Sequence, residues 1–327
     1  MSKKHEKSPC CRAVIIRFGK RRRRCVKCKR TWSVWQRKRG RKRLRTSPLL
    51  AHRFVSGRLL PVRSGRLNTR NKKSYRLAKS RSLCAERCPW PEIPKAGPLI
   101  AVGDALVKCI EGTWHTWYFI LVRPVDENTA IALPFYHRKG AETVRGWREA
   151  FDAVPENVLE RIKALVCDGH RGLVFEAKWR YWLLQRCHFH LIARIQSRRS
   201  KWKSSQHYKE GRYLYELVKK VLTESDELKI RKYVNDLEVF SWHTSSPDLK
   251  NCLKGFVNHY PEFRTYLAHP ELNLPMTNNT AEVLIGLVEE ISRRAKGFQK
   301  ISIFNEWISV VLKTRGRIKC RGIHQQN

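Results

Sequence analysis

Five short apolar runs between residues 98 and 190 constrain the fold of this chain more than any other feature. PLIAVGDAL, WYFILVRP and NTAIALPFY follow one another with turn residues between them, which predicts three antiparallel strands. KALVCDG and YWLLQRCHFH predict a fourth and a fifth strand, with a short helix between them from Gly172. Before the fourth run, GAETVRGWREAFDAV predicts a helix whose sheet-facing side carries Val144, Trp147, Phe151 and Val154.

The resulting order, β-β-β-α-β-α-β, is that of the α/β class known as the ribonuclease H-like fold. In that fold the first and fourth strands are adjacent, so Asp104 and Asp168, which end the first and fourth runs, are expected to be neighbours at one edge of the sheet. Two such carboxylates can hold Mg²⁺ or Mn²⁺. For Asp168 the alternatives are a turn former and a zinc ligand beside Cys167 and His170, and for Asp104 the alternative is Asp126.

A third acidic ligand should come from a helix further along the chain. MTNNTAEVLIGLVEEISRRAKGF predicts such a helix, with a cap-like TNNT, Glu282 in the first turn, and a sheet-facing stripe of Val283, Leu287 and Ile291. Glu282 is preferred to Glu289 and Glu290, because those two lie deep in the helix among basic side chains.

The interval from Asp168 to Glu282 spans 114 positions, which is too long for a simple connection between a strand and a helix. Residues 208–222, 226–240 and 248–268 show helical periodicity, with apolar stripes such as Leu214, Leu217, Val218 and Val221. An all-helical segment is therefore expected ahead of the glutamate.

Positive charge is concentrated in the first part of the chain. The 327 residues carry 68 Lys and Arg against 28 Asp and Glu, a formal net charge of +40. Residues 1–95 hold 32 of the basic side chains and only three acidic ones. Such a charge favours a polyanionic partner, first of all nucleic acid. CPWPEIPKAGP, residues 88–98, predicts the boundary between this basic arm and the body.

The arm begins with paired cysteines, a β-branched run, a Gly-Lys turn, a basic strand and a CxxC pair, in CCRAVIIRFGKRRRRCVKC. This is the outline of a zinc ribbon, in which two cysteine knuckles hold a hairpin that has no core of its own. It resembles the ribbon at the front of many transposases, whose first knuckle reads CPxC, although Ser8 stands at the first ligand position here. The predicted ligands are Cys11, Cys25 and Cys28, with His5 or Cys10 as the fourth, and a plain hairpin without metal is the alternative.

Two short helices are expected behind the ribbon, after the basic run VWQRKRGRKRLR. SPLLAHRFVSGRL has Ser47 as a candidate N-cap, and NTRNKKSYRLAKSRSL predicts a second helix from Asn68. A helix-turn-helix is one interpretation, and a helical hairpin that binds phosphates without reading bases is the other. The predicted DNA-binding residues of the arm are Arg21, Arg22, Arg23, Arg24, Lys72, Lys73 and Arg76.

The body resembles the Mutator-type group of DDE transposases of prokaryotic insertion sequences over residues 95–320. The resemblance rests on Asp104, CDG with Asp168, QRCHFH and NNTAE with Glu282, in that order and spacing. In that group a C-x-x-H pair follows the second aspartate, and the matching residues here are Cys187 and His190. The glutamate helix of that group is preceded by a Thr-Asn pair and followed by a basic Gly-Phe stretch, which correspond here to Thr277-Asn278 and Lys296-Gly297-Phe298.

This resemblance implies a transposase whose catalytic residues Asp104, Asp168 and Glu282 bind two Mg²⁺ or Mn²⁺ ions, with Cys187 and His190 as accessory residues. Its partners would be double-stranded DNA, as terminal repeats and target, and further copies of the chain. The expected organisation is a zinc-ribbon-like segment at 1–36, a helix-turn-helix-like region at 37–90, and a ribonuclease H-like domain at 95–320 with a helical insertion at about 195–272.

Two other functions remain open. One is a DNA-binding regulator or domesticated transposase without catalysis, and the other is a structure-specific nuclease on the same fold. No run of about 18 apolar residues occurs and the N-terminus lacks an apolar signal segment, so neither a membrane helix nor secretion is expected. Eleven cysteines then favour free thiols or metal ligands over disulfides, and a cytoplasmic, nucleoid-associated protein of a prokaryote is expected.

Overall fold

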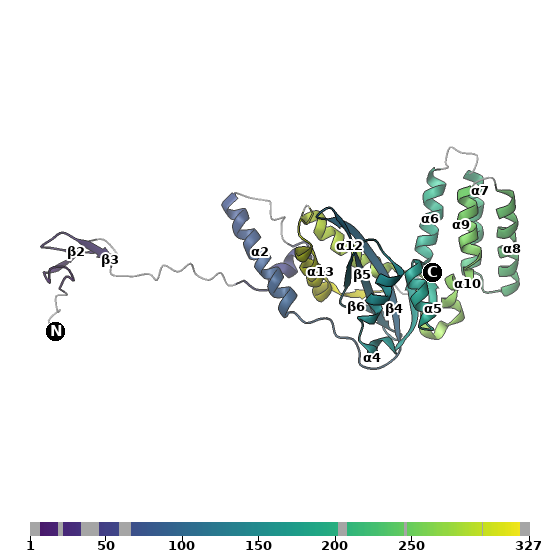
Figure 1. The fold of residues 1–327 in the computed structure, drawn as a ribbon, viewed down its shortest axis with the longest axis horizontal. Coiled ribbons are helices and arrows are strands. Elements are labelled where there is room, and N and C mark those ends of the chain that lie inside the picture. The colour runs from purple at the N-terminus through teal and green to yellow at the C-terminus, as the bar shows by residue number, and fades with distance from the viewer. Residues whose placement is uncertain are drawn as a thin grey trace. The chain divides into compact units, whose positions relative to one another are not determined.

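The computed structural model describes residues 7–18, 22–33, 46–58, 67–201, 208–244, 247–295 and 297–320. It divides into two compact units, Met1–Thr46 and Ser47–Asn327 (Figure 1). The first unit contains a three-stranded antiparallel sheet of β1 (Ile15–Arg17), β2 (Arg22–Cys25) and β3 (Thr31–Ser33). The hairpin predicted from the β-branched run and the basic strand is thereby confirmed, with Ile15 opposite Cys25.

The second unit is built on a seven-stranded sheet. Its strands are β4 (Leu99–Ile110), β5 (Thr113–Pro124), β6 (Thr129–Ala132), β7 (Tyr136–Lys139), β8 (Ile162–Cys167), β9 (Leu183–Arg186) and β10 (Arg317–Lys319). The order is β10-β6-β5-β4-β8-β9, and β7 pairs with β5. Strand β5 is antiparallel to both of its neighbours, β4 and β6, whereas β8 is parallel to β4 and β9 is parallel to β8. The five expected strands are present, and β7 and β10 were not predicted.

The first strand is longer than its sequence pattern indicated. We expected the run to end at Asp104, but β4 continues to Ile110. It pairs with β5 along its whole length, and Asp104 lies opposite Phe119. The strand continues because its partner does, and Leu106 and Ile110 are still buried beyond the carboxylate. Asp104 is therefore held in the middle of a twelve-residue strand.

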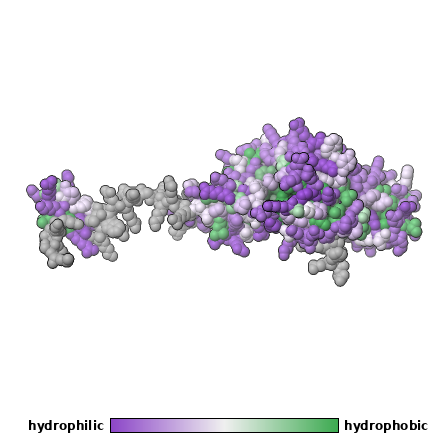
Figure 2. All heavy atoms as spheres, turned by 90° about the horizontal axis from the view of Figure 1, so that it is seen from below, coloured by the Kyte–Doolittle hydropathy of each residue, from purple (hydrophilic) through white to green (hydrophobic). Residues whose placement is uncertain are grey.

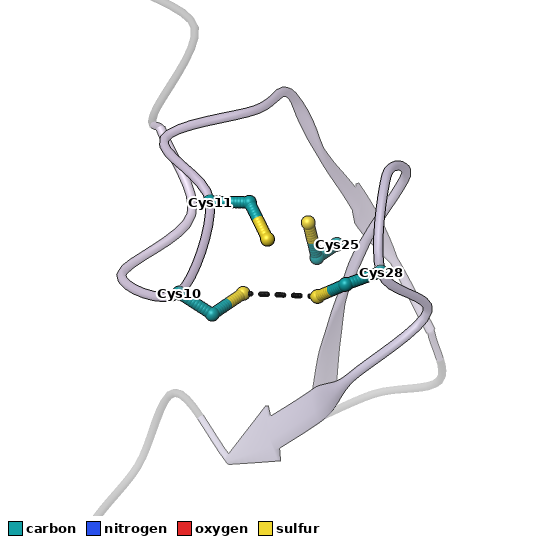
Figure 3. Close-up of side chains that lie close together, drawn as sticks. All are labelled: Cys10, Cys11, Cys25 and Cys28. Carbon is teal, nitrogen blue, oxygen red and sulfur yellow. Dashed lines mark hydrogen bonds between the residues drawn. The ribbon is translucent and has the colours of Figure 1, made fainter.

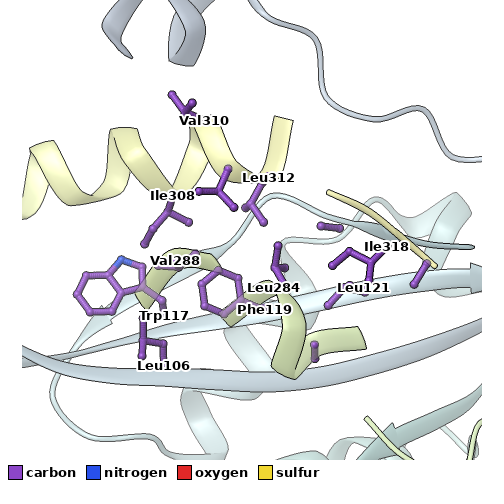
Figure 4. Packing of buried hydrophobic residues seen from close by; sticks show 14 of the residues in the cluster. Leu106, Trp117, Phe119, Leu121, Leu284, Val288, Ile308, Val310, Leu312 and Ile318 are labelled. Atoms are coloured by element: carbon purple, nitrogen blue, oxygen red, sulfur yellow. The ribbon is translucent and has the colours of Figure 1, made fainter. Parts of the chain in front are cut away.

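Helices cover both faces of this sheet. On one face lie α12 (Asn279–Arg294) and α13 (Ile301–Arg315), and on the other lie α3 (Val144–Asp152) and α5 (Arg171–Trp179), with the short α4 (Glu156–Leu159) nearby in the chain. Because side chains alternate along a strand, Trp117, Phe119 and Leu121 of β5 pack under α12 and α13 (Figure 4). Their neighbours Tyr118 and Ile120 pack under α3 and α5.

Two predicted helix faces were partly wrong. The buried stripe of α12 is Ala281, Leu284, Val288 and Ile291, whereas Val283 is 43% exposed. This helix is apolar on more than one side, so periodicity alone did not identify the buried stripe. In α3, Trp147 and Phe151 are buried as predicted, but Val144 at the first position is 39% exposed.

The helices α1 (Leu49–Val55) and α2 (Leu67–Arg87) belong to the second unit and pack against α13. Arg81 Nε donates to Glu306 Oε2 at 2.5 Å, and Lys313 Nζ donates to the Ala85 carbonyl at 2.6 Å. Residues 88–98 therefore connect elements of one compact unit, and the division by contacts falls between residues 46 and 47. Ser47 is not the N-cap of α1, because Pro48 occupies that position without a side-chain cap.

A helical segment separates β9 from α12. It comprises α6 (His188–Lys201), α7 (Tyr208–Thr223), α8 (Glu227–His243), α9 (Pro247–Val257), α10 (Tyr260–Phe263), α11 (Thr265–Ala268) and the 3-10 turn Pro270–Leu272 (Figure 1). The helices predicted at 208–222 and 226–240 are confirmed as α7 and α8, whereas the pattern at 248–268 forms three shorter helices, α9, α10 and α11. The α7 stripe of Leu214, Leu217, Val218 and Val221 is buried. The segment is fastened to the sheet by Gln185 of β9, whose Nε2 donates to the Phe263 carbonyl at 3.0 Å.

The surface is strongly polar. Figure 2 shows hydrophilic residues over most of the visible face, with hydrophobic residues in scattered patches. Within the described ranges, no helix combines the length and the apolar character needed to cross a bilayer.

Candidate functional site

Asp104 lies in β4, and Asp168 directly follows the last residue of the adjacent parallel strand β8. The register pairs Val102 of β4 with Val166 of β8, so each aspartate comes two residues after a paired position. Val102 and Val166 both pack in the core on the α12 side, and two residues is one full period of a strand. Both carboxylates are therefore directed toward the side of the sheet that α12 covers.

Asp168 is held by the turn that follows β8. The His170 backbone N–H donates to Asp168 Oδ1 at 2.8 Å. Gly169 has φ +94°, a conformation that side chains rarely adopt, and a Cβ there would also lie 3.0 Å from Arg186 Nη1. Cys167 is fully buried and packs on the opposite face with Leu165. The glycine thus lets the chain turn sharply at the carboxylate, and Cys167 belongs to the core.

Glu282 lies in the first turn of α12, and Asn278 connects that helix end to Asp104. The predicted TNNT cap is not formed, because Asn278 at the N-cap position makes no side-chain cap hydrogen bond. Its Nδ2 donates instead to Asp104 Oδ2 at 3.2 Å, and its backbone N–H donates to Cys187 Sγ at 3.4 Å. Asn278 is fully buried. From the sequence we interpreted this asparagine only as part of a cap and missed its position in the site.

The Cys-x-x-His pair is next to Glu282. His190 Nδ1 lies 3.5 Å from Glu282 Oε1, and the ligand atoms of Cys187, His190 and Glu282 are all within 4.8 Å of one another. Cys187 is buried, and its backbone N–H donates to the Cys167 carbonyl at 2.8 Å, directly before Asp168. The start of α6 therefore lies between the second aspartate and the glutamate.

The pKa values of Asp104 and Glu282 differ from those of ordinary surface carboxylates. The pKa of Asp104 is raised from 3.8 to about 7, mainly by burial and in addition by the nearby charges of Asp168 and Glu282, while the backbone hydrogen bond from Ala105 opposes the shift. Burial also raises the pKa of Glu282, while His190 lowers it. A hydrogen bond with Cys187 raises the pKa of His190. The site thus concentrates negative charge in a partly desolvated place.

A further carboxylate, Glu142, approaches from the loop before α3. Its Oε1 lies 3.2 Å from His170 Nδ1 and accepts a hydrogen bond from Trp147 Nε1 at 2.6 Å. Burial raises the pKa of Glu142, and the charge of Asp168 raises it further. Sequence reasoning missed this residue, because nothing marks it beyond its place at the start of a predicted helix.

A cleft of about 1100 Å³ begins at Asp168 and His190 and extends to the helical segment. Three basic side chains line it, Arg171, Lys178 and Arg186. Two of them are paired with Glu262, Arg186 at 2.5 Å between Nε and Oε2 and Lys178 at 3.6 Å between Nζ and Oε1. The cleft therefore combines a carboxylate at one end with positive charge along its wall.

An aromatic pair on α5 adjoins this cleft. The rings of Phe175 and Trp179 are nearly parallel, with an interplanar angle of 11° and centroids 6.3 Å apart. The Arg148 guanidinium lies over both, 4.9 Å and 5.3 Å from the two centroids. Phe175 also lines the cleft, and the two aromatic residues are 40% and 64% exposed. Large flat side chains beside basic groups form a surface on which nucleic-acid bases can stack.

In the first unit, four cysteines converge (Figure 3). The sulfur atoms of Cys10, Cys11, Cys25 and Cys28 all lie within 4.8 Å of one another, and those of Cys10 and Cys28 are 3.3 Å apart. The buried Ser8 hydroxyl accepts the backbone N–H groups of Cys11 and Ala13. Although the two cysteines are adjacent in sequence, the turn held by Ser8 directs both toward the CxxC pair. The cluster can bind zinc, and His5 lies outside the described residues.

The predicted DNA-binding residues of the arm lie in both units. Arg22 of β2 is exposed and Arg23 and Arg24 are half-buried, while Arg21 is outside the described residues. On α2, Lys72, Lys73 and Arg76 are all exposed. These three occupy the part of α2 that precedes its contact with α1.

Comparison with known protein families gives a match to the body of the chain. The family model described as "Transposase, Mutator family" matches residues 133–302, just over half of the chain. The matched range includes Asp168, Cys187, His190 and Glu282 and begins after Asp104. No curated protein matches the chain.

Proposed function

Because the chain belongs to the Mutator family of transposases, we propose that it cleaves and joins DNA strands with Asp104, Asp168 and Glu282 as its catalytic carboxylates. The observation that carries this proposal is the meeting of three distant segments. A mid-strand aspartate, a strand-end aspartate and a first-turn glutamate are brought to one side of one sheet, where the charges of Asp168 and Glu282 both raise the pKa of Asp104.

The order of the strands supports a ribonuclease H-like fold. The segment β6-β5-β4-β8-β9 has the first three strands antiparallel and the next two parallel to β4, with helices on both faces. This is the arrangement that the sequence order β-β-β-α-β-α-β led us to expect. It also explains why residues 64 positions apart, Asp104 and Asp168, have adjacent places in the sheet.

The chemistry of the site fits a divalent cation. Glu282 Oε1 is buried without a hydrogen-bond partner among the described residues, and the raised pKa of Asp104 reflects burial and neighbouring carboxylates. Oxygen-rich, negatively charged sites of this kind suit Mg²⁺ or Mn²⁺. Two such ions, held by Asp104, Asp168 and Glu282, would activate the attacking water and stabilise the departing 3′ oxygen.

The residues around the carboxylates would hold them in position for this reaction. Asn278 fixes Oδ2 of Asp104, and the backbone N–H of His170 fixes Oδ1 of Asp168. His190 lies against Glu282 and lowers its pKa, which favours the ionised carboxylate. In the first reaction a water oxygen bonds to the phosphorus, the bond from phosphorus to the 3′ oxygen breaks, and the proton that the water loses is balanced by the one that the departing 3′ oxygen takes up. In strand transfer, the freed 3′-hydroxyl loses its proton and bonds to a phosphorus of the target DNA, while the bond from that phosphorus to the target's 3′ oxygen breaks and this oxygen leaves as a hydroxyl.

DNA binding is supported by charge and by shape. The net charge of +40 suits a polyanion. Arg171 and Lys178 line the cleft that begins at Asp168, so a strand bound there would present its phosphates to the carboxylates. The substrates would be double-stranded terminal repeats and target DNA of a prokaryotic insertion sequence. Since two element ends must be held together, the chain would act as a homo-oligomer on DNA, in the cytoplasm and on the nucleoid.

The four cysteines of the first unit would bind structural zinc. Four thiolates about 2.3 Å from one ion lie about 3.8 Å from one another in a tetrahedral site. The convergence of all four sulfur atoms within 4.8 Å is close to that arrangement and favours Cys10 as the fourth ligand. Zinc would give this small unit the stability that its three short strands cannot supply by packing.

A strand-transfer assay tests the proposed activity. Labelled element ends, Mg²⁺ and a target plasmid should give cleaved ends and joined products with the wild-type chain. Asp104→Asn, Asp168→Asn and Glu282→Gln should each abolish both products while DNA binding persists. Glu289→Gln, an exposed position on the same helix, is the matched control and should retain both.

Each outcome identifies one function. Binding without cleavage by the wild-type chain would indicate a regulator, and cleavage without joining would indicate a nuclease. Cleavage by any of the three carboxylate variants at the wild-type rate would refute the assignment of that residue.

A further inference from the structure

A second cluster of soft metal ligands lies at the contact between α1 and α2. His52 of α1, Cys84 of α2 and Cys88, which directly follows α2, have ligand atoms within 4.8 Å of one another, and Cys88 Sγ is 3.8 Å from His52 Nε2. Neither the catalytic carboxylates nor the zinc ribbon uses these residues. We propose that His52, Cys84 and Cys88 bind a zinc ion that fastens α1 to α2. This inference is independent of the transposase activity proposed above.

The three ligands are presented by a contact that is already ordered. Cys88 follows the last residue of α2, and its backbone N–H donates to the Cys84 carbonyl at 3.1 Å. This bond continues the helical pattern for one more residue, so the two thiols lie one turn apart on the same side. Ser80, one turn earlier on that side, accepts the backbone N–H of Ala51 at 2.8 Å and donates to the Ser47 carbonyl at 2.6 Å. Its hydroxyl thus caps α1 from the neighbouring helix. His52 follows Ala51 directly, which places the imidazole next to the thiols.

Two thiols and one imidazole are a donor set that zinc prefers. On binding, each thiol would release its proton to solvent and ligate as thiolate. Among the described residues the cluster holds three ligands. Cys84 is buried while His52 and Cys88 are half-buried, so the fourth position would face outward and take water.

The metal would stabilise a helix that is too short to persist alone. α1 has seven residues, well below the length at which isolated helices are stable. Phe54 and Val55 of α1 are buried in the core that α13 also supplies. Fastening α1 to α2 would therefore fix both helices on α13, and with them the exposed basic residues Lys72, Lys73 and Arg76.

The test measures zinc bound to the full chain. In a variant in which Cys10, Cys11, Cys25 and Cys28 are all changed to Ser, elemental analysis after gel filtration should still find about one zinc per chain. Adding His52→Ala or Cys88→Ser should reduce this to near zero. With Co²⁺ in place of zinc, the thiolate-to-metal charge-transfer absorption should disappear with the same substitutions. Cys109→Ser, an exposed thiol outside the clusters, is the control and should change neither signal.

Three results would overturn the proposal. The first is a ribbon variant that binds no zinc, and the second is zinc content unchanged by His52→Ala and Cys88→Ser. The third is loss of the zinc on Cys187→Ser instead, which would assign it to the Cys-x-x-His pair. Because Cys84 is buried and its replacement can disturb packing, the half-buried His52 and Cys88 carry the test, with circular dichroism verifying that each variant is folded.

Discussion

Asp104 should lower the stability of the metal-free protein, and its replacement by asparagine should raise it. Folding raises the pKa of this carboxyl from 3.8 to about 7, chiefly through burial. A raised pKa means that the folded state holds the proton more tightly than the unfolded state. The stabilisation of the folded state by this bound proton is complete below a pH of about 4 and is lost as the pH rises through about 7. An asparagine side chain at this position would not ionise and would avoid this loss.

The size of the effect follows from the two pKa values. At about 1.36 kcal/mol per pH unit, the difference between the two pKa values lowers the free energy of unfolding by about 4 kcal/mol at pH 8 and by about 1 to 2 kcal/mol at pH 5, where only the unfolded state has lost the proton. The new asparagine also has a hydrogen-bond partner available. Asn278 Oδ1 is buried without a partner among the described residues, so turning the Asn278 amide over would let it accept from the new amide.

Urea unfolding in metal-free buffer tests this reasoning, with tryptophan fluorescence as the probe because Trp117 and Trp147 are fully buried. Asp104→Asn should be more stable than the wild-type chain at pH 8 by several kcal/mol, and the difference should narrow at pH 5. Saturating Mg²⁺, at about 100 times its dissociation constant, should stabilise the wild-type chain by about 2.7 kcal/mol and the variant by less. A variant that is less stable at pH 8, or a difference that does not depend on pH, would refute the argument.

Three other predictions concern packing, DNA and pH. Gly103→Ala should lower the free energy of unfolding in urea by about 1–3 kcal/mol, because the new Cβ would lie 2.6 Å from a methyl carbon of Leu173 in α5. Gly286→Ala is the control: its Cβ would enter open space on α12, and it should raise the free energy of unfolding by up to about 1 kcal/mol. Trp179→Ala should weaken the binding of single-stranded DNA by about 1–3 kcal/mol, measured by fluorescence anisotropy. Trp242→Ala, which removes an exposed tryptophan of α8, should leave this binding unchanged. Equal losses of DNA affinity in the two variants would contradict a stacking surface on α5. His190→Ala removes a charge that lowers the pKa of Glu282, so the acidic limb of the pH profile of DNA cleavage should move to higher pH. An acidic limb that stays at the same pH would argue against the contact between His190 and Glu282.

Strand and helix positions were largely predictable because they depend on local periodicity. The five apolar runs became β4, β5, β6, β8 and β9, and two of the helical patterns became α7 and α8, while the third was divided into α9, α10 and α11. The errors arose where a local pattern was ambiguous or where a partner strand decided the outcome. β4 continues past Asp104 because β5 pairs with it, and α12 buries Leu284 and Val288 because the sheet meets that side of an apolar helix.

The residues that hold the candidate site together were harder to predict than its carboxylates. Aspartates after apolar runs and a glutamate at a helix start are visible in sequence. Asn278 and Glu142 have no such pattern, because their partners, Asp104 and His170, are 174 and 28 positions away in the chain. The sequence left the fourth zinc ligand open between His5 and Cys10, and the turn held by Ser8 brings Cys10 and Cys11 together with the CxxC pair.

The sequence by itself determined the charge, the alternation of strands and helices, and the residue types able to bind metal, since each of these is a property of neighbouring positions. The tertiary structure decided which of those residues meet. The parallel pairing of β4 with β8 brings Asp104 to Asp168, the start of α12 adds Glu282, and the packing of α1 on α2 brings His52 to Cys84 and Cys88. Metal chemistry requires ligand atoms a few ångströms apart, and among residues distant in sequence only the packed fold sets such distances.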